Sequence, residues 1–208
     1  MVLFPVSLGA ELKPLDELVA GIQESYDRAK DFKAEFVQET TIKSIDKVER
    51  EEGMVYFKKP KKMLWDYSKP KSKRMVINPT KAWLYIPQDN TVYIQDAKKV
   101  FSSQLIIRFL TGVGRLKDDF YVCYADSHGT DAKGNYVLEL KPSAAAAGIA
   151  KLHLTVDKEY YHIIGCSLQD IYGNLTLITF RNIQINTDLD DSLFSFTPPP
   201  GATVQDVP

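Results

Sequence analysis

The stretch Gly53–Pro70, GMVYFKKPKKMLWDYSKP, constrains the fold of this chain more than any other. It predicts two short strands, Met54–Lys58 and Met63–Tyr67, because aromatic and large apolar side chains favour strands. Pro60 lies between them and cannot donate to a strand ladder, so the chain is expected to turn there. An antiparallel strand with one solvated face alternates apolar and polar residues, whereas the first strand here is apolar on both faces. Both faces therefore need cover, which implies a second layer or a cavity.

Length and charge narrow the classes of protein to which the chain can belong. Its 208 residues fit one or two domains and are enough to bury a sizeable core. The 26 basic and 27 acidic residues leave a net charge of −1, which gives no global attraction to nucleic acid or to an anionic membrane. The basic runs Lys58–Lys62 and Lys71–Arg74 are flanked by aromatic residues, but their acidic neighbours favour solvated turns over a nucleic-acid site. No apolar run is long enough to predict a membrane-spanning helix.

The N-terminus and the cysteines bear on export and redox state. Residues 1–10 are apolar without a basic leading segment. We interpret residues 1–11 as the remnant of a signal peptide or as a tag, with an N-terminal strand as the alternative. Cys123 and Cys166 both lie in apolar, strand-like runs. Two interpretations stay open for them, burial as free thiols and a disulfide.

The hydrophobic pattern changes from a helical period to a strand period early in the chain. Residues 14–32 carry an apolar stripe at helical spacing, and from Phe32 to Phe36 apolar and charged residues alternate. About eleven short strands are expected in all, the last of them in the segment LFSF at 193–196. Their short connections make neighbouring strands antiparallel. The pattern predicts a mostly β (α+β) fold in a single domain over residues 1–208, a large curled antiparallel sheet whose concave side is covered by helices.

A second helix is expected at Gln104–Thr111, with Ser102 or Ser103 as its cap and Gly112 at its end. Apolar side chains wrap most of its circumference, and a helix that is apolar all round is buried on all sides. In a sheet protein of this size, such a helix either fills the core or closes a hydrophobic opening. On this pattern both roles stay open for residues 101–112.

No set of residues with catalytic or metal-binding spacing is found. The three histidines, His128, His153 and His162, do not share a metal-ligand spacing with each other or with the cysteines. No nucleophile elbow or candidate triad is present. We therefore expect no catalytic residues and no metal, although a small hydrolase with dispersed catalytic residues remains an alternative.

Several motifs occur in an order and spacing that match one family. They are F-x-A-x-F-x-Q at 32–38, G-x-V-x-F-K-K-P at 53–60, L-W-x-Y-x-x-P at 64–70, W-x-Y at 83–85, D-x-x-G-N at 170–174, I-x-F at 178–180 and L-F-x-F-x-P-P-x-G at 193–201. Over about residues 12–206 the chain resembles the periplasmic outer-membrane lipoprotein carrier proteins, the LolA family.

The resemblance implies an unclosed β-barrel with helices over its concave side and a hydrophobic cavity for the acyl chains of lipoproteins. It implies a periplasmic carrier, expected to be a monomer, that is not an enzyme and has no cofactor. Its expected partners are acylated lipoproteins, an inner-membrane ABC transporter complex and an outer-membrane lipoprotein acceptor. The alternative within binding proteins is a domain of the same half-barrel type that senses lipids or lipoproteins.

On this resemblance we expect residues 101–112 to form a lid helix, and apolar side chains of the strands and of this helix to line the acyl cavity. These residues are Phe36, Val55, Phe57, Leu64, Trp65, Leu84, Ile106, Ile107 and Leu110. Family members often have an arginine before the proline of the strand turn, where it holds the lid closed, and this chain has Lys59 there. Lysine has three donors on a flexible stem instead of a planar five-donor fork, so the closed state is expected to be held either differently or less firmly.

Overall fold

A computed structural model describes residues 12–103, 115–143 and 149–207. The helices are α1 (Leu15–Arg28), α2 (Ala97–Ser103) and α4 (Leu116–Asp119), with 3-10 turns η1 (Lys43–Ile45), η2 (Pro87–Asp89) and η3 (Asp191–Phe194). The strands are β1 (Asp31–Ile42), β2 (Lys47–Lys58), β3 (Lys62–Lys69), β4 (Lys73–Ile77), β5 (Lys81–Ile86), β6 (Thr91–Asp96), β7 (Phe120–Tyr124), β8 (Tyr136–Pro142), β9 (Ile149–Val156), β10 (Ile163–Asp170), β11 (Leu175–Ile185) and β12 (Thr203–Asp206).

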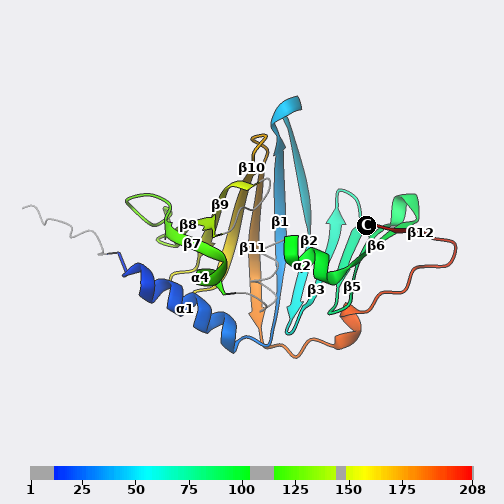
Figure 1. Cartoon of the computed structure of the whole chain (residues 1–208), viewed down its shortest axis with the longest axis horizontal. Helices are drawn as coiled ribbons and strands as arrows, with labels where there is room; N and C mark the ends of the chain where they lie inside the picture. The colour runs from blue at the N-terminus through cyan, green and yellow to red at the C-terminus, as the bar shows by residue number, and fades with distance from the viewer. Residues whose placement is uncertain (1–11, 104–114, 144–148, 208) are drawn as a thin grey trace, which may run out of the picture.

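The described strands form one twelve-stranded sheet in the order β12-β6-β5-β4-β3-β2-β1-β11-β10-β9-β8-β7. Neighbouring strands run antiparallel, except that β12 lies parallel to β6. The sheet is curled, and β12 and β7 at its two ends do not pair with each other (Figure 1). The predicted fold class, a large curled antiparallel sheet that remains unclosed, is confirmed.

Helix α1 begins after Pro14 and places one apolar face against the sheet. Leu18, Val19 and Ile22 are buried in the same cluster as the apolar side chains of β8 and β9. The helix is shorter than the expected 14–32, because the backbone at Ala29 is already extended and β1 begins two residues later. The pairing of β1 with β11 and β2 overrides the helical pattern there.

The two faces of the sheet carry separate apolar clusters. We call inner the face that carries Phe36, Val55 and Trp65, which belong to one cluster with the buried residues of α1. The outer face carries a second cluster, in which Leu64 and Trp83 pack with side chains of the C-terminal segment that follows β11. The second layer implied by the two apolar faces of β2 and β3 is therefore supplied on the outer side by the chain itself.

The C-terminal segment differs from the expected strand at LFSF. Leu193 and Phe194 are the last two residues of the 3-10 turn η3. The Asp190 carboxylate caps the start of this turn by accepting a hydrogen bond from the Ser192 N–H at 2.7 Å. Asp191 forms ion pairs with Lys58 and Lys62, each at 2.8 Å. The strand at this end of the chain is β12 instead.

The helix expected at Gln104–Thr111 lies outside the described residues. Ser102 and Ser103, its expected caps, are the last two residues of α2. Residues 104–112, the rest of the predicted lid, lie outside the described residues, as do residues 1–11. None of the helices in the described ranges has the length and apolar character needed to cross a membrane.

Candidate binding site on the inner face

Six aromatic side chains of β1, β2, β3 and β11 lie together on the inner face, and we call them the aromatic cluster. They are Phe32, Phe36, Phe57, Trp65, Tyr67 and Phe180. The Phe36 ring centroid lies 4.7 Å from that of Trp65 and 4.9 Å from that of Tyr67, both edge-on. Phe180 reaches Trp65 at 6.2 Å. Edge-to-face contacts at these distances stabilise aromatic pairs beyond their area burial.

The strand period and one glycine bring these rings together. Residues two apart on a strand share a face, which places Phe32 and Phe36 on the same side of β1. Gly53 of β2 lies opposite Phe36 on one side and Tyr67 on the other. A Cβ atom on Gly53 would lie 2.1 Å from the backbone oxygen of Asp66, so no other residue fits there without moving β3. Glycine is thus required by a close approach of two backbones.

The structure brings most of the predicted cavity residues to the inner face. Phe36, Val55, Phe57 and Trp65 are all buried in the inner cluster. Leu84 is half-buried and shares their face, because it lies opposite Met75 of that cluster.

Leu64 does not lie on the inner face. It is buried in the outer cluster beside Val76, because neighbouring residues on a strand point to opposite faces and Trp65 points inward. We therefore withdraw Leu64 from the predicted set. Ile106, Ile107 and Leu110 lie outside the described residues.

Sequence reasoning missed three members of the aromatic cluster: Phe32, Tyr67 and Phe180. The strand period could have identified Phe32 and Tyr67, because Phe32 lies four residues from Phe36 and Tyr67 lies two residues from Trp65. The alternation at 178–180 marked a strand face, but nothing in the sequence shows that β11 pairs with β1. Phe180 lies directly opposite Phe36 in that pairing.

Lys59 connects the β2–β3 turn to helix α1. Its Nζ donates to the backbone carbonyl of Tyr26 and, at 3.3 Å, to that of Asp27, both in the last turn of the helix. A cation is favourable at a helix C-terminus because the last carbonyls have no partner within the helix. Burial lowers the pKa of the Lys59 ammonium, and the nearby Asp27 carboxylate acts in the opposite direction. The predicted contact of Lys59 with the lid would fall on residues outside the described part.

We expect Lys59→Met to lower the free energy of unfolding by about 1 kcal/mol, because the carbonyls of Tyr26 and Asp27 lose their side-chain donor. Amide hydrogen exchange in the last turn of α1 should become faster, and denaturant unfolding should give the change in stability. Lys71→Met, which removes an exposed lysine, is the control. Equal exchange in the two variants would show that Lys59 does not hold α1.

A small pocket continues the aromatic cluster toward the end of α1. Its walls include Tyr26, Phe32, Phe57, Lys59 and His162. Burial raises the pKa of the Tyr26 hydroxyl. Burial also lowers the pKa of His162, although the Asp157 carboxylate acts in the opposite direction. The pocket is mostly apolar, with the Lys59 ammonium at its edge.

The two cysteines are free thiols, so the disulfide interpretation is wrong. Cys166 lies among inner-face residues, and burial raises the pKa of its thiol to about 12. A thiol with such a pKa is protonated at neutral pH and therefore unreactive. Across residues 12–103, 115–143 and 149–207, no three His, Cys, Asp or Glu side chains are grouped so that they could hold a metal ion.

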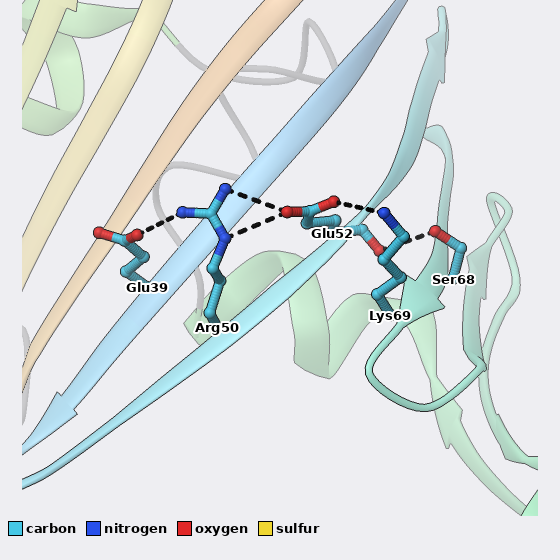
Figure 2. A network of polar contacts seen from close by, with 5 residues as sticks. All are labelled: Glu39, Arg50, Glu52, Ser68 and Lys69. Carbon is cyan, nitrogen blue, oxygen red and sulfur yellow. Dashed lines mark hydrogen bonds and ion pairs between the residues drawn. The ribbon is translucent and has the colours of Figure 1, made fainter.

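The outer face of the long β1–β2 hairpin carries a charged network instead of an apolar surface (Figure 2). Arg50 donates to Glu39 at 2.6 Å and to Glu52 at 3.0 Å, and Lys69 pairs with the other oxygen of Glu52 at 3.2 Å. These side chains are largely exposed, and exposed ion pairs each contribute little to stability. The network joins three strands on the solvated side, which leaves the inner face as the candidate site.

An unclosed, curled sheet with a helix against its aromatic inner face defines the half-barrel class of β proteins. The family model described as outer membrane lipoprotein carrier protein LolA matches residues 27–197. This chain belongs to that family, and the resemblance drawn from its motifs is confirmed.

Similar proteins agree with this assignment. The outer-membrane lipoprotein carrier protein of Methylococcus capsulatus is 29% identical over 86% of this chain and 82% of its own length. The outer-membrane lipoprotein carrier protein of Dechloromonas aromatica is 27% identical over 93% of this chain and 91% of its own length. Among solved structures, an uncharacterized conserved protein from Thermus thermophilus matches with a TM-score of 0.59 at 13% identity, over 92% of this chain and 98% of that one. A DUF1329 family protein from Desulfovibrio piger matches with a TM-score of 0.51 at 14% identity, over 88% of this chain and 98% of that one. These two structures support the fold alone.

Proposed function

We propose that this chain is a periplasmic carrier that binds the acyl chains of lipoproteins on its inner face and takes them from the inner to the outer membrane. The observation that carries the proposal is the aromatic cluster, a continuous set of rings on the inner face of an unclosed sheet. Relatives named outer-membrane lipoprotein carrier protein support it. The remaining inner-face candidates Val55 and Leu84 extend this surface, and Ile106, Ile107 and Leu110 are proposed to cover it.

The energetics of acyl binding constrain how such a carrier works. Each buried methylene contributes about 0.8 kcal/mol, so a long acyl chain against the aromatic cluster binds tightly. A carrier without a source of energy cannot drive release. It must instead receive cargo from an inner-membrane ABC transporter complex and pass it to an outer-membrane acceptor with higher affinity. A protein that only senses lipoproteins would bind the same chains without passing them on, and the relatives' names favour the carrier.

The two tryptophans provide a direct test, because they lie on opposite faces. Trp65 belongs to the aromatic cluster, whereas Trp83 packs against Phe196 on the outer face with a ring-centroid distance of 6.3 Å. Trp83→Phe leaves Trp65 as the only tryptophan, and Trp65→Phe leaves Trp83. Bromine quenches tryptophan emission on contact. We therefore expect a lipopeptide with brominated acyl chains to quench Trp65 strongly and Trp83 weakly.

The same peptide without acyl chains is the control, and it should quench neither tryptophan. Equal quenching of the two, or none with the acylated peptide, would contradict binding on the inner face. Transfer of the bound lipopeptide to outer-membrane vesicles then separates a carrier from a sensor. Hydrolysis of the acyl esters during the assay would favour the hydrolase instead.

A further inference from the structure

We propose that four polar residues at the edge of the aromatic cluster bind the uncharged ester and amide groups that join the acyl chains to a lipoprotein, and that the negative charge among them disfavours the phosphate of phospholipids. The proposal rests on the proposed function and assigns the recognition of the head group to particular side chains. We call these residues the polar rim. They are Gln38 of β1, Glu51 of β2, Tyr67 of β3 and Lys73 of β4.

The strand register places the polar rim on the inner face, directly beyond the aromatic residues. Gln38 follows Phe36 by two residues and lies opposite Glu51. Lys73 precedes the inner-face residue Met75 by two residues and lies opposite Tyr67. Four adjacent strands therefore each contribute one polar side chain at the same end of one apolar surface.

The four side chains contact one another in a closed circuit. The Tyr67 hydroxyl donates to Gln38 Oε1 at 3.2 Å, and Gln38 Nε2 donates to Glu51 Oε2 at 3.2 Å. Lys73 Nζ lies 2.6 Å from Glu51 Oε1 and 4.1 Å from the centroid of the Tyr67 ring. These contacts fix the direction in which each polar group points.

Tyr67 belongs to both the polar rim and the aromatic cluster. Its ring lies 4.9 Å from Phe36 and stacks on Trp65 at 6.2 Å, while its hydroxyl bonds to Gln38. Burial raises the pKa of this hydroxyl above its ordinary range, so it remains a neutral donor. An acyl chain that lies along the aromatic cluster thus reaches polar groups where its own polar end begins.

The donors and charges of the polar rim match an uncharged head group. An ammonium has three N–H donors and an amide has two, and the contacts within the described part of the chain use one donor of Lys73 and one of Gln38. The unused donors suit ester and amide carbonyls, which only accept hydrogen bonds. The side chains of Lys73 and Glu51 are 31% and 21% exposed, so a ligand can reach them. Glu51 neutralises Lys73, and its negative charge disfavours a phosphate group.

The test measures dissociation constants from the quenching of Trp65 in the Trp83→Phe background. The ligands are a synthetic triacylated lipopeptide with brominated acyl chains and the uncharged apolar probe N-phenyl-1-naphthylamine, which lacks such a head group. We expect Tyr67→Phe and Lys73→Met each to weaken lipopeptide binding by about 5- to 10-fold and to leave probe binding unchanged. Lys69→Met removes a lysine that pairs with Glu52 on the outer face at 3.2 Å, and this control should bind both ligands as the parent does.

A second measurement tests the role of the Glu51 charge. Glu51→Gln leaves Lys73 without its carboxylate partner, so we expect phosphatidylglycerol with brominated acyl chains, in micelles of a neutral detergent, to bind about tenfold more tightly. Unchanged lipopeptide binding in Tyr67→Phe and Lys73→Met, or equal losses for lipopeptide and probe, would overturn head-group recognition. Unchanged phosphatidylglycerol binding in Glu51→Gln would overturn the selection against phosphate. Failure of the parent to bind lipopeptide would instead refute the proposed function.

Discussion

Gly53→Ala is expected to lower the free energy of unfolding by about 3 kcal/mol. The added Cβ would lie 2.1 Å from the Asp66 oxygen and 2.9 Å from the Tyr67 Cα, both of them backbone atoms. The clash can be relieved only by moving β3 away from β2, which separates rings of the aromatic cluster. For a chain of this length the loss corresponds to a fall in Tm of about 6–12 °C. Denaturant and thermal unfolding measure it.

Gly165→Ala is the matched control, because this glycine also lies within a strand. Its added Cβ would find its nearest neighbours, the Ile178 oxygen and the Thr155 side chain, at 3.4 Å. That distance is close to ordinary van der Waals contact, and we expect a change of less than about 1 kcal/mol. If the two variants were equally stable, the close approach of β2 and β3 would not be what requires glycine at position 53.

Asp31→Asn is expected to lower the free energy of unfolding by about 3 kcal/mol, because it disrupts a buried hydrogen-bonded turn. One oxygen of Asp31 accepts from the N–H and hydroxyl of Thr187, and the other accepts from the N–H groups of Asp188 and Leu189. An amide has one oxygen only, so in either orientation its NH2 group faces donors. The turn directs the chain from β11 to the outer face, so the Trp83 emission should also change.

Asp126→Asn is the control for this change. A single oxygen of Asp126 accepts both of its backbone hydrogen bonds, from His128 and Gly129 at 2.9 Å each. An amide oxygen can replace it, so we expect a loss of less than about 1 kcal/mol. Comparable losses in the two variants would contradict a special role of Asp31.

The same proteins show whether the charge of Asp31 stabilises the fold. Burial alone would raise the pKa of this carboxyl, but the hydrogen bonds from Thr187, Leu189 and Asp188 outweigh it and hold the pKa below its ordinary value of 3.8. A carboxyl with a lowered folded pKa contributes stability that is complete above the ordinary value and is lost as the pH falls through the folded value. The stability gap between parent and Asp31→Asn should therefore be constant from about pH 7 to 5 and narrow below about pH 4.

The local sequence pattern predicts the helices and strands of this chain better than it predicts which of them lie side by side. The helix near residues 14–28 and the paired strands around Pro60 follow from hydrophobic period and turn chemistry, which act between residues close in sequence. The double-faced pattern of β2 and β3 also predicted cover on both sides. The pattern could not show that the outer cover is the chain's own C-terminal segment.

The candidate site was predicted in part for the same reason. Alternation identifies the two faces of a strand but does not say which one is inward. The prediction therefore put Leu64 and Trp65 in the same cavity, although they belong to clusters on opposite faces of the sheet. Phe180 joins Phe36 through a pairing of strands far apart in the sequence, and the parallel pairing of β12 with β6 is equally nonlocal. The polar rim depends on the register of four strands at once.

The open edges of the sheet bear on how much material the molecule can enclose. In a closed barrel, the strand number and stagger fix the diameter, so the interior cannot widen without breaking a ladder. Here β12 and β7 end the sheet without pairing to each other. The curvature can therefore increase or relax by small changes of twist shared among the strands, while every ladder remains paired. We therefore expect the space on the inner face to vary with the curvature of the sheet and not to be fixed by the number of strands.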